Sequence, residues 1–176
     1  MSRAQAQALP TATRNSGVDV FFTGGHGDTD YGTTGTAFSV GGDVALFGRP
    51  RFGLQTAIEA RLIDMPSDYI GTKDFAGGIR VGRPLHFHRI TPYADFLIGY
   101  GTISFPGLRH PGYTHDNSVT YNFGGGVDVP VFGPFAAKVD YQEESWKLGD
   151  ASSRLTPSAF TVGVVYTLPL SFHIHR

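Results

Sequence analysis

Two pairs of histidines in this sequence have a spacing at which a transition metal could bind. His86 and His88 form one His-x-His pair, and His173 and His175 form the other. In an extended chain, residues two apart point to the same side, so the two rings of a pair could share one metal ion. The sequence has no cysteine, and no carboxylate accompanies either pair at ligand spacing. We therefore interpret all four histidines as polar rim residues and expect no bound metal or cofactor.

A second set of reactive side chains lies in the polar stretch that follows Phe105. It contains His110, His115, Asp116 and Ser118, from which a nucleophile and a base could assemble. We place all four in the longest connecting loop of the chain. The run Gly124–Gly126 is no phosphate-binding loop, because no Gly-Lys-Ser or Gly-Lys-Thr follows it.

Composition excludes several classes of protein. A formal net charge of −1 gives no reason to expect nucleic acid as a partner. No run approaches the roughly 18 uncharged apolar residues of a membrane helix, so a helical membrane protein is excluded. The length suits one domain, which we place at residues 17–176. Residues 1–16 are a polar segment, in which Ala4 to Ala8 is either the small-residue end of a signal sequence or part of a plain tail.

The elements that carry these side chains are predicted to be strands, because apolar and polar residues alternate along most of the chain. The clearest case runs from Val119 to Tyr141, where two arms flank a turn at Val131 to Pro134. Each arm has about ten residues, the length that a tilted strand needs to cross a bilayer. The same pattern predicts six further strands, at residues 18–24, 36–47, 52–63, 73–81, 91–103 and 158–168.

The connections and the two faces of these strands favour a membrane barrel. Long and short connections are expected to alternate, with one rim outside the cell and the other in the periplasm. The polar face holds most of the glycines and charges of both signs, as a narrow lumen would. The other face carries aromatic residues that we place near strand ends: Phe22, Phe52, Phe75, Tyr100, Tyr121, Phe135, Tyr141, Phe160 and Tyr166. A soluble lipocalin-type barrel would have the opposite sidedness.

The pattern resembles that of the eight-stranded outer-membrane β-barrels, the family of the OmpA transmembrane domain and the opacity-type proteins. The resemblance rests on the rhythm of strands and loops and on the segments PYADFLIGYG and AFTVGVVYTLPL, and it covers roughly Gly17 to the end. It implies an all-β, eight-stranded antiparallel up-and-down barrel in the bacterial outer membrane. The implied partners are the barrel-insertion machinery, outer-membrane lipid and lipopolysaccharide. Members usually end in an aromatic residue, whereas here residues 173–176 follow Phe172.

The resemblance implies a structural or surface-interaction role, with a ligand bound through the outer loops. One alternative is a narrow cation-preferring channel, and another is an enzyme that modifies lipid A. Deacylases of this size resemble one another in a His-x-Ser pair on a strand, which this sequence lacks. Palmitoyltransferases have an amphipathic amino-terminal helix, which residues 2–17 cannot form. We therefore predict no enzyme activity.

A polar network inside the barrel is the predicted site of interest. Its members are Asp43, Glu59, Arg61, Arg80, Asp95, Asp128, Lys138, Asp140 and Glu144, with Asp19 and Asp74 on the same face. Because eight strands enclose just enough space for their own side chains, these groups are expected to pair across the lumen and close it. Arg80, Asp95, Asp128, Lys138 and Asp140 are predicted at one level near the short turns. A higher layer is predicted to hold Glu59, Arg61 and Glu144.

Overall fold

The computed structural model describes residues 17–30, 32, 34–46, 53–67, 70–85, 90–104, 115–147 and 154–169. Within them the chain forms the strands β1 Val18–Asp28, β2 Thr34–Ala45, β3 Gln55–Met65, β4 Gly71–Gly82, β5 Thr91–Ser104, β6 His115–Phe132, β7 Phe135–Lys147, β8 Arg154–Leu155 and β9 Ser158–Leu168. No helix in this part of the chain is long and apolar enough to cross a membrane.

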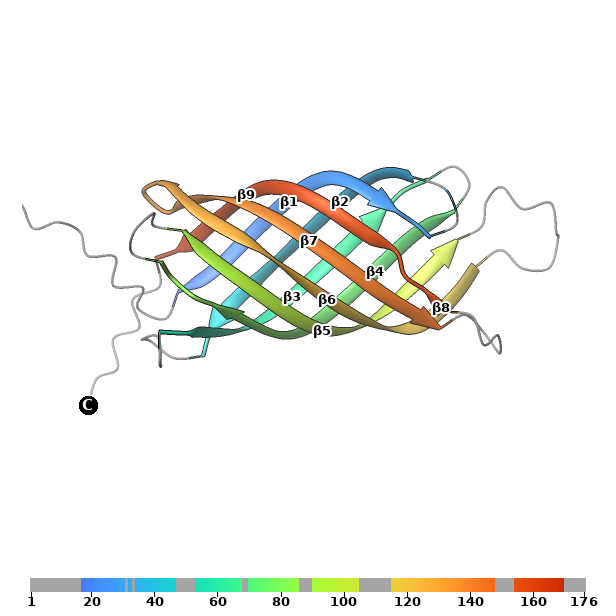
Figure 1. Cartoon of the computed structure of the whole chain (residues 1–176), viewed down its shortest axis with the longest axis horizontal. Helices are drawn as coiled ribbons and strands as arrows, with labels where there is room; N and C mark the ends of the chain where they lie inside the picture. Colours follow the sequence, from blue (N-terminus) through green and yellow to red (C-terminus); the bar gives the residue numbers. More distant parts are fainter. Residues whose placement is uncertain are drawn as a thin grey trace, which may run out of the picture.

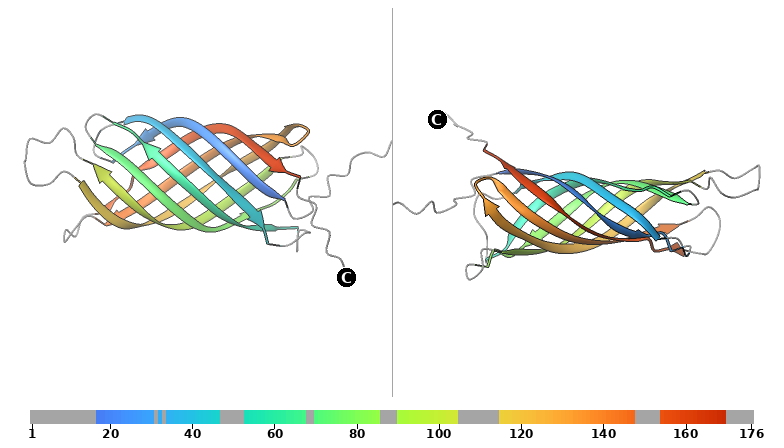
Figure 2. Two further views of the ribbon diagram at one scale, coloured as in Figure 1. Left: turned by 180° about the vertical axis from the view of Figure 1, so that it is seen from behind. Right: turned by 90° about the horizontal axis from the view of Figure 1, so that it is seen from above.

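The long strands close into one antiparallel barrel. The order is β6-β5-β4-β3-β2-β1-β9-β7, and β6 also pairs with β7, so that each long strand has two neighbours. The strands run obliquely to the barrel axis in Figure 1, and the closed wall is visible from the other sides in Figure 2. The predicted fold class is confirmed. The two-residue strand β8, which pairs with β7, was not predicted, because it lies within a polar connection.

The two ends of the barrel differ, and each is given a name here. The "turn end" carries the β6–β7 turn, and the "far end" carries the β1–β2, β3–β4 and β5–β6 connections. At the turn end, Gly133 has a φ of 53°, a conformation that glycine adopts without steric cost. Pro130 lies beyond Asp128, the last residue of β6 that pairs with β5, so its missing N–H removes no bond to that strand.

The strands continue further toward the far end than the sequence predicts. The ladder between β1 and β2 continues to Asp28 and Thr34, through a glycine-rich stretch predicted as a loop. The β1–β2 connection is therefore residues 29–33, much shorter than the loop predicted there. Backbone pairing with a neighbouring strand extends these strands despite residues of poor strand propensity.

Apolar side chains cover the outside of the barrel. The exposed large apolar residues include Val20, Phe22, Val40, Ile58, Phe75, Ile79, Phe96, Ile98, Tyr100, Phe123, Tyr141, Phe160 and Val162. The prediction that the outward aromatics lie near strand ends is wrong for Phe22 and Tyr141, which lie in the interior of β1 and β7. Phe52 lies outside the described residues. The outer surface is thus largely apolar over the middle of the strands.

Glycines on the inner face make room for large side chains in the lumen. A Cβ atom at Gly101 would overlap the ring of Trp146, and one at Gly124 would overlap the amide of Gln142. At Gly77, on the outer face, the nearest atom to such a Cβ would be the backbone oxygen of Glu59 at 3.6 Å, an ordinary contact. The inner glycines therefore decide which side chains can fill the barrel.

We expect Gly101→Val to destabilise the barrel by about 1–3 kcal/mol, because Trp146 would be forced out of its place. Urea unfolding in lipid vesicles, followed by fluorescence, measures this directly, since Trp146 is the only tryptophan in the chain. Gly77→Val is the matched control and should leave the midpoint nearly unchanged. Equal midpoints for the two variants would contradict this account of the packing.

Candidate functional site: the polar lumen

The inner wall buries an unusual number of charged side chains. All the residues predicted for the lumen network are buried, as are Asp19 and Asp74, which makes eight carboxylates and three basic groups. They come from alternate positions of their strands; β7, for example, contributes Lys138, Asp140 and Glu144. The lumen therefore has more acid than base among the described residues.

Arg80 organises the charges nearest the turn end. Its guanidinium Nη1 lies 2.6 Å from Asp43 Oδ2, its Nη2 donates to Asp128 Oδ2, and its Cζ stands 3.8 Å from the ring centre of Tyr93. These contacts join β4 to β2, β5 and β6 across the barrel. Two carboxylates compensate one buried cation, so this layer is tightly paired.

Arg61 organises the next layer. Its Nε donates to Glu59 Oε1 at 2.6 Å and its Nη1 donates to Asp140 Oδ2 at 2.7 Å, while its Nη2 lies 3.6 Å from Asp95 Oδ2. The hydroxyl of Tyr93 donates to the other oxygen of Asp140. Asp95 and Asp140 thus pair with Arg61, whereas the sequence placed them level with Arg80. The stagger of tilted strands, which a flat count of positions ignores, accounts for the difference.

Lys138 lies between two aromatic rings inside the lumen. Its Nζ is 4.1 Å from the ring centre of Tyr93, 4.7 Å from that of Phe21 and 3.6 Å from Asp128 Oδ1. The guanidinium of Arg61 lies 5.3 Å from the same Phe21 ring. Cations and rings therefore alternate from Arg61 to Arg80, an arrangement that holds the three cations apart while filling the lumen.

Asp74 and Glu144 form a third polar group that contains no basic residue. Asp74 accepts hydrogen bonds from Thr120 Oγ1 at 2.7 Å and from Asn122 Nδ2 at 2.6 Å. Glu144 accepts one from Trp146 Nε1 at 2.6 Å. Neutral donors rather than cations therefore supply the hydrogen bonds of these two carboxyl groups.

Apolar side chains fill the lumen at the far end. They form two buried clusters, one of Ile70, Ile103, Trp146 and Leu155 and one of Ala37, Ile63, Met65 and Ala159. These clusters were not predicted, because the inner face was interpreted as polar throughout. The alternation itself would have found Ile63, Met65 and Trp146, since they continue the inward positions of Arg61 and Glu144. The lumen is thus sealed by apolar packing at this end.

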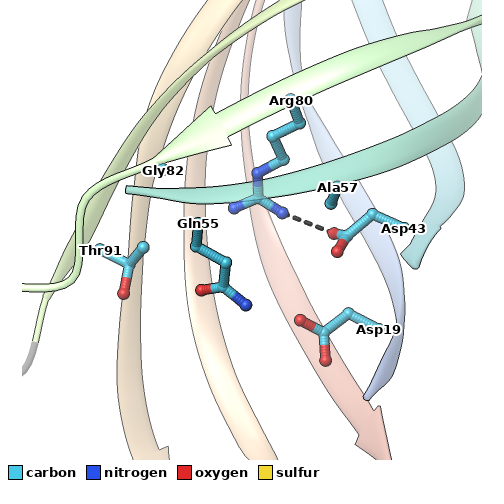
Figure 3. Close-up of a pocket in the computed structure, with 7 residues that line it drawn as sticks. All are labelled: Asp19, Asp43, Gln55, Ala57, Arg80, Gly82 and Thr91. Carbon is cyan, nitrogen blue, oxygen red and sulfur yellow. Dashed lines mark hydrogen bonds and ion pairs between the residues drawn. The ribbon is translucent and has the colours of Figure 1, made fainter. Parts of the chain in front are cut away.

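A small space remains at the turn end. It has a volume of about 10 Å³ and is lined by Asp19, Asp43, Gln55, Ala57, Arg80, Gly82 and Thr91. Figure 3 shows Arg80 reaching from β4 toward Asp43, with Asp19 and Gln55 beside the same space. Such a volume admits about one water molecule. The side chains around this space therefore leave room for little more than one water molecule.

The other candidate sites are only partly within the described residues. His86, His88, His110, His173 and His175 lie outside them. His115, Asp116 and Ser118 belong to β6, so placing them in a loop was wrong. Ser118 Oγ donates to the carbonyl of Val119 at 3.2 Å, and Asp116 Oδ1 accepts from the N–H of Asn117 at 2.8 Å. The described residues contain no group of three or more histidines and carboxylates arranged to hold a metal.

Solved structures with the same closed barrel identify the fold. Neisserial surface protein A superposes with a TM-score of 0.58 at 12% identity, over 85% of this chain and 95% of that one. The fold is that of the eight-stranded outer-membrane β-barrels.

Two more structures with this fold are similar to the chain. Ail of Yersinia pestis has a TM-score of 0.54 at 12% identity, covering 87% of this chain and 97% of Ail. The amino-terminal barrel of Pseudomonas aeruginosa OprF also has a TM-score of 0.54 at 12% identity, covering 88% of this chain and 98% of that domain. No protein-family model and no curated protein sequence matches the chain. At this identity the likeness concerns the fold alone.

Proposed function

We propose that this chain is a bacterial outer-membrane protein with a structural or surface-interaction role. The observation that carries the proposal is the sidedness of the wall. Phe22, Phe75 and Tyr100 are about 60% exposed on the outside, whereas Arg61 and Lys138 are about 1% exposed within. A soluble barrel exposing so continuous an apolar surface would associate or aggregate in water, but lipid covers it without cost.

The proposed partners follow from that placement. Outer-membrane lipid and lipopolysaccharide would surround the apolar wall, and the barrel-insertion machinery would deliver the chain to the membrane. A surface ligand would bind through the outer loops. We propose no enzymatic activity, and the hydrogen bond from Ser118 to the Val119 carbonyl supports this, since it turns the hydroxyl proton to the backbone.

The purified chain is expected to require detergent and to migrate differently on a gel before and after boiling. A closed barrel leaves only short free sheet edges at its rims and unfolds slowly, so it keeps its shape in cold detergent. Gel electrophoresis of boiled and unboiled samples makes the measurement, and the boiled sample is the internal control. A chain that stays monomeric and soluble without detergent would overturn the membrane assignment.

A narrow cation-preferring channel is the second candidate, and the excess of buried carboxylates favours it. We expect little conductance in the native chain, because the lumen is filled, and a preference for cations in any residual current. Lys138→Ala or Arg80→Ala should increase the current in planar bilayers by removing bulk and positive charge from the lumen. The control is Lys73→Ala, because Lys73 is an exposed residue of β4. A large, steady, anion-selective current in the native chain would contradict both the filling and the acidity.

A further inference from the structure

The wall of the barrel has a groove at the far end, beside the part of β6 that lies nearest that end. The pairing of β6 with β7 starts at Thr120, opposite Trp146, yet β6 itself begins at His115. Within the described residues, the first four residues of β6, His115 to Ser118, pair only with β5. The groove next to them has a volume of about 420 Å³ and is lined by Tyr100, Asp116, Asn117, Ser118, Val119, Tyr121 and Lys147.

We propose that this groove binds a membrane lipid with a phosphate head group, with the phosphate at Lys147 and an acyl chain along Tyr100 and Tyr121. The proposal rests on the placement of the barrel in a membrane. It goes beyond that placement because it assigns one lipid class to one site. A groove of this size is large enough for a head group and the first part of a chain.

The apolar side of the groove is continuous with the lipid-facing wall. Tyr100, Val119 and Tyr121 are all exposed on the outside of β5 and β6. Toward the turn end, the apolar surface continues with the contacting rings of Phe96 and Phe123, whose centres are 4.8 Å apart. An acyl chain that lies against this wall elsewhere can therefore extend into the groove.

The outer surface becomes polar at the level of the groove. Next along β5 and β6 come Thr102 and Asn117, joined by a hydrogen bond of 2.7 Å from the threonine hydroxyl to the amide oxygen. Tyrosine rings are common at the level of the lipid head groups, where the surface of a membrane protein changes from apolar to polar. The bond to Thr102 occupies the oxygen of Asn117, which leaves its NH₂ group as a donor toward the groove.

Lys147 supplies the positive charge that a phosphate needs. It is exposed at the end of β7, and it forms no ion pair with the described residues. The lysine on β4 differs: Lys73 Nζ lies 3.0 Å from Asp64 Oδ2, which neutralises it. Asp116 is the one carboxylate in the described lining, and its Oδ1 accepts the N–H of Asn117. The groove thus offers an ammonium and an amide donor to an anion.

A lipid fits these features better than a free anion does. Inorganic phosphate would use Lys147 and Asn117 but would gain nothing from the two tyrosines. An extended peptide could pair with β6, but it would not require a phosphate. The combination of an apolar wall with a lysine that has no ion pair among the described residues therefore favours an acylated phosphate.

Native mass spectrometry of the full chain in detergent tests the proposal. The probes are dioleoyl phosphatidic acid and dioleoylglycerol, which have the same acyl chains with and without a phosphate. We expect the phosphatidic acid to bind more tightly to the native chain and Lys147→Gln to weaken it by about tenfold, as the loss of one charge-assisted contact would. Lys73→Gln is the matched control and should bind as the native chain does. Tyr121→Ala should weaken both lipids.

Three results would overturn the assignment. Equal retention by Lys147→Gln and Lys73→Gln would mean that the phosphate does not bind at Lys147. Displacement of the phosphatidic acid by an equal concentration of inorganic phosphate would show a site for free anions. If Tyr121→Ala lost both lipids while Lys147→Gln lost neither, only an acyl chain would occupy the groove. A chain that shows no boiling-dependent gel shift would instead fail the proposed function, so the two failures are distinguishable.

Discussion

Replacing Arg61 with methionine is expected to lower the free energy of unfolding by about 3–5 kcal/mol, the cost of removing one partner from a buried ion pair. Methionine keeps much of the volume of the side chain but none of its charge. Glu59 and Asp140 would lose their close cation, and Asp95 would lose one at 3.6 Å. Since all three carboxylates are buried, water in bulk cannot replace the guanidinium.

Urea unfolding in lipid vesicles measures the effect, with the boiling-dependent gel shift as an independent reading of the folded fraction. Lys73→Met is the matched control. Its ion pair with Asp64 is solvent-exposed, so the loss should be below about 1 kcal/mol. Adding Asp140→Asn to Arg61→Met should restore part of the stability, because it removes one of the uncompensated charges. Equal stability of Arg61→Met and Lys73→Met would mean that the lumen charges do not depend on Arg61.

Placing an arginine at Ile98 is expected to destabilise the barrel in a bilayer by about 2–4 kcal/mol. Ile98 is about half exposed on the outer face, near the middle of β5. At this depth the guanidinium would lie in hydrocarbon unless it reached the interface or distorted the bilayer. Val162→Arg on β9 should behave in the same way, because Val162 is exposed to the same extent.

Phe132→Arg is the control for depth. Phe132 is also an exposed apolar residue, but it lies beside the β6–β7 turn, where an arginine should cost only about 0–1 kcal/mol. Folding yield and urea midpoints in vesicles distinguish the three variants. If Ile98→Arg and Val162→Arg were tolerated as well as Phe132→Arg, the apolar wall would not face lipid, and the barrel would be a soluble one.

Local alternation of the sequence was sufficient to predict the strands and their two faces. The predicted strand at residues 158–168 coincides with β9, and the start of β7 was predicted at Phe135. The inward residues of the lumen network were recognised by position alone, because side chains of a strand alternate with a period of two wherever the strand goes. That period depends on the backbone of one strand and needs no knowledge of its neighbours.

The tertiary structure decided how far the strands extend and which charges meet. Asp28 and His115 lie in stretches that read as loops, and it is pairing with a neighbouring strand that makes them part of the barrel. Arg61 pairs with Asp140, which is 79 residues away in the chain. The stagger between tilted strands sets this pairing, and closure of the whole barrel sets the stagger. A local pattern therefore predicts which side chains enter the lumen, while their partners depend on every strand at once.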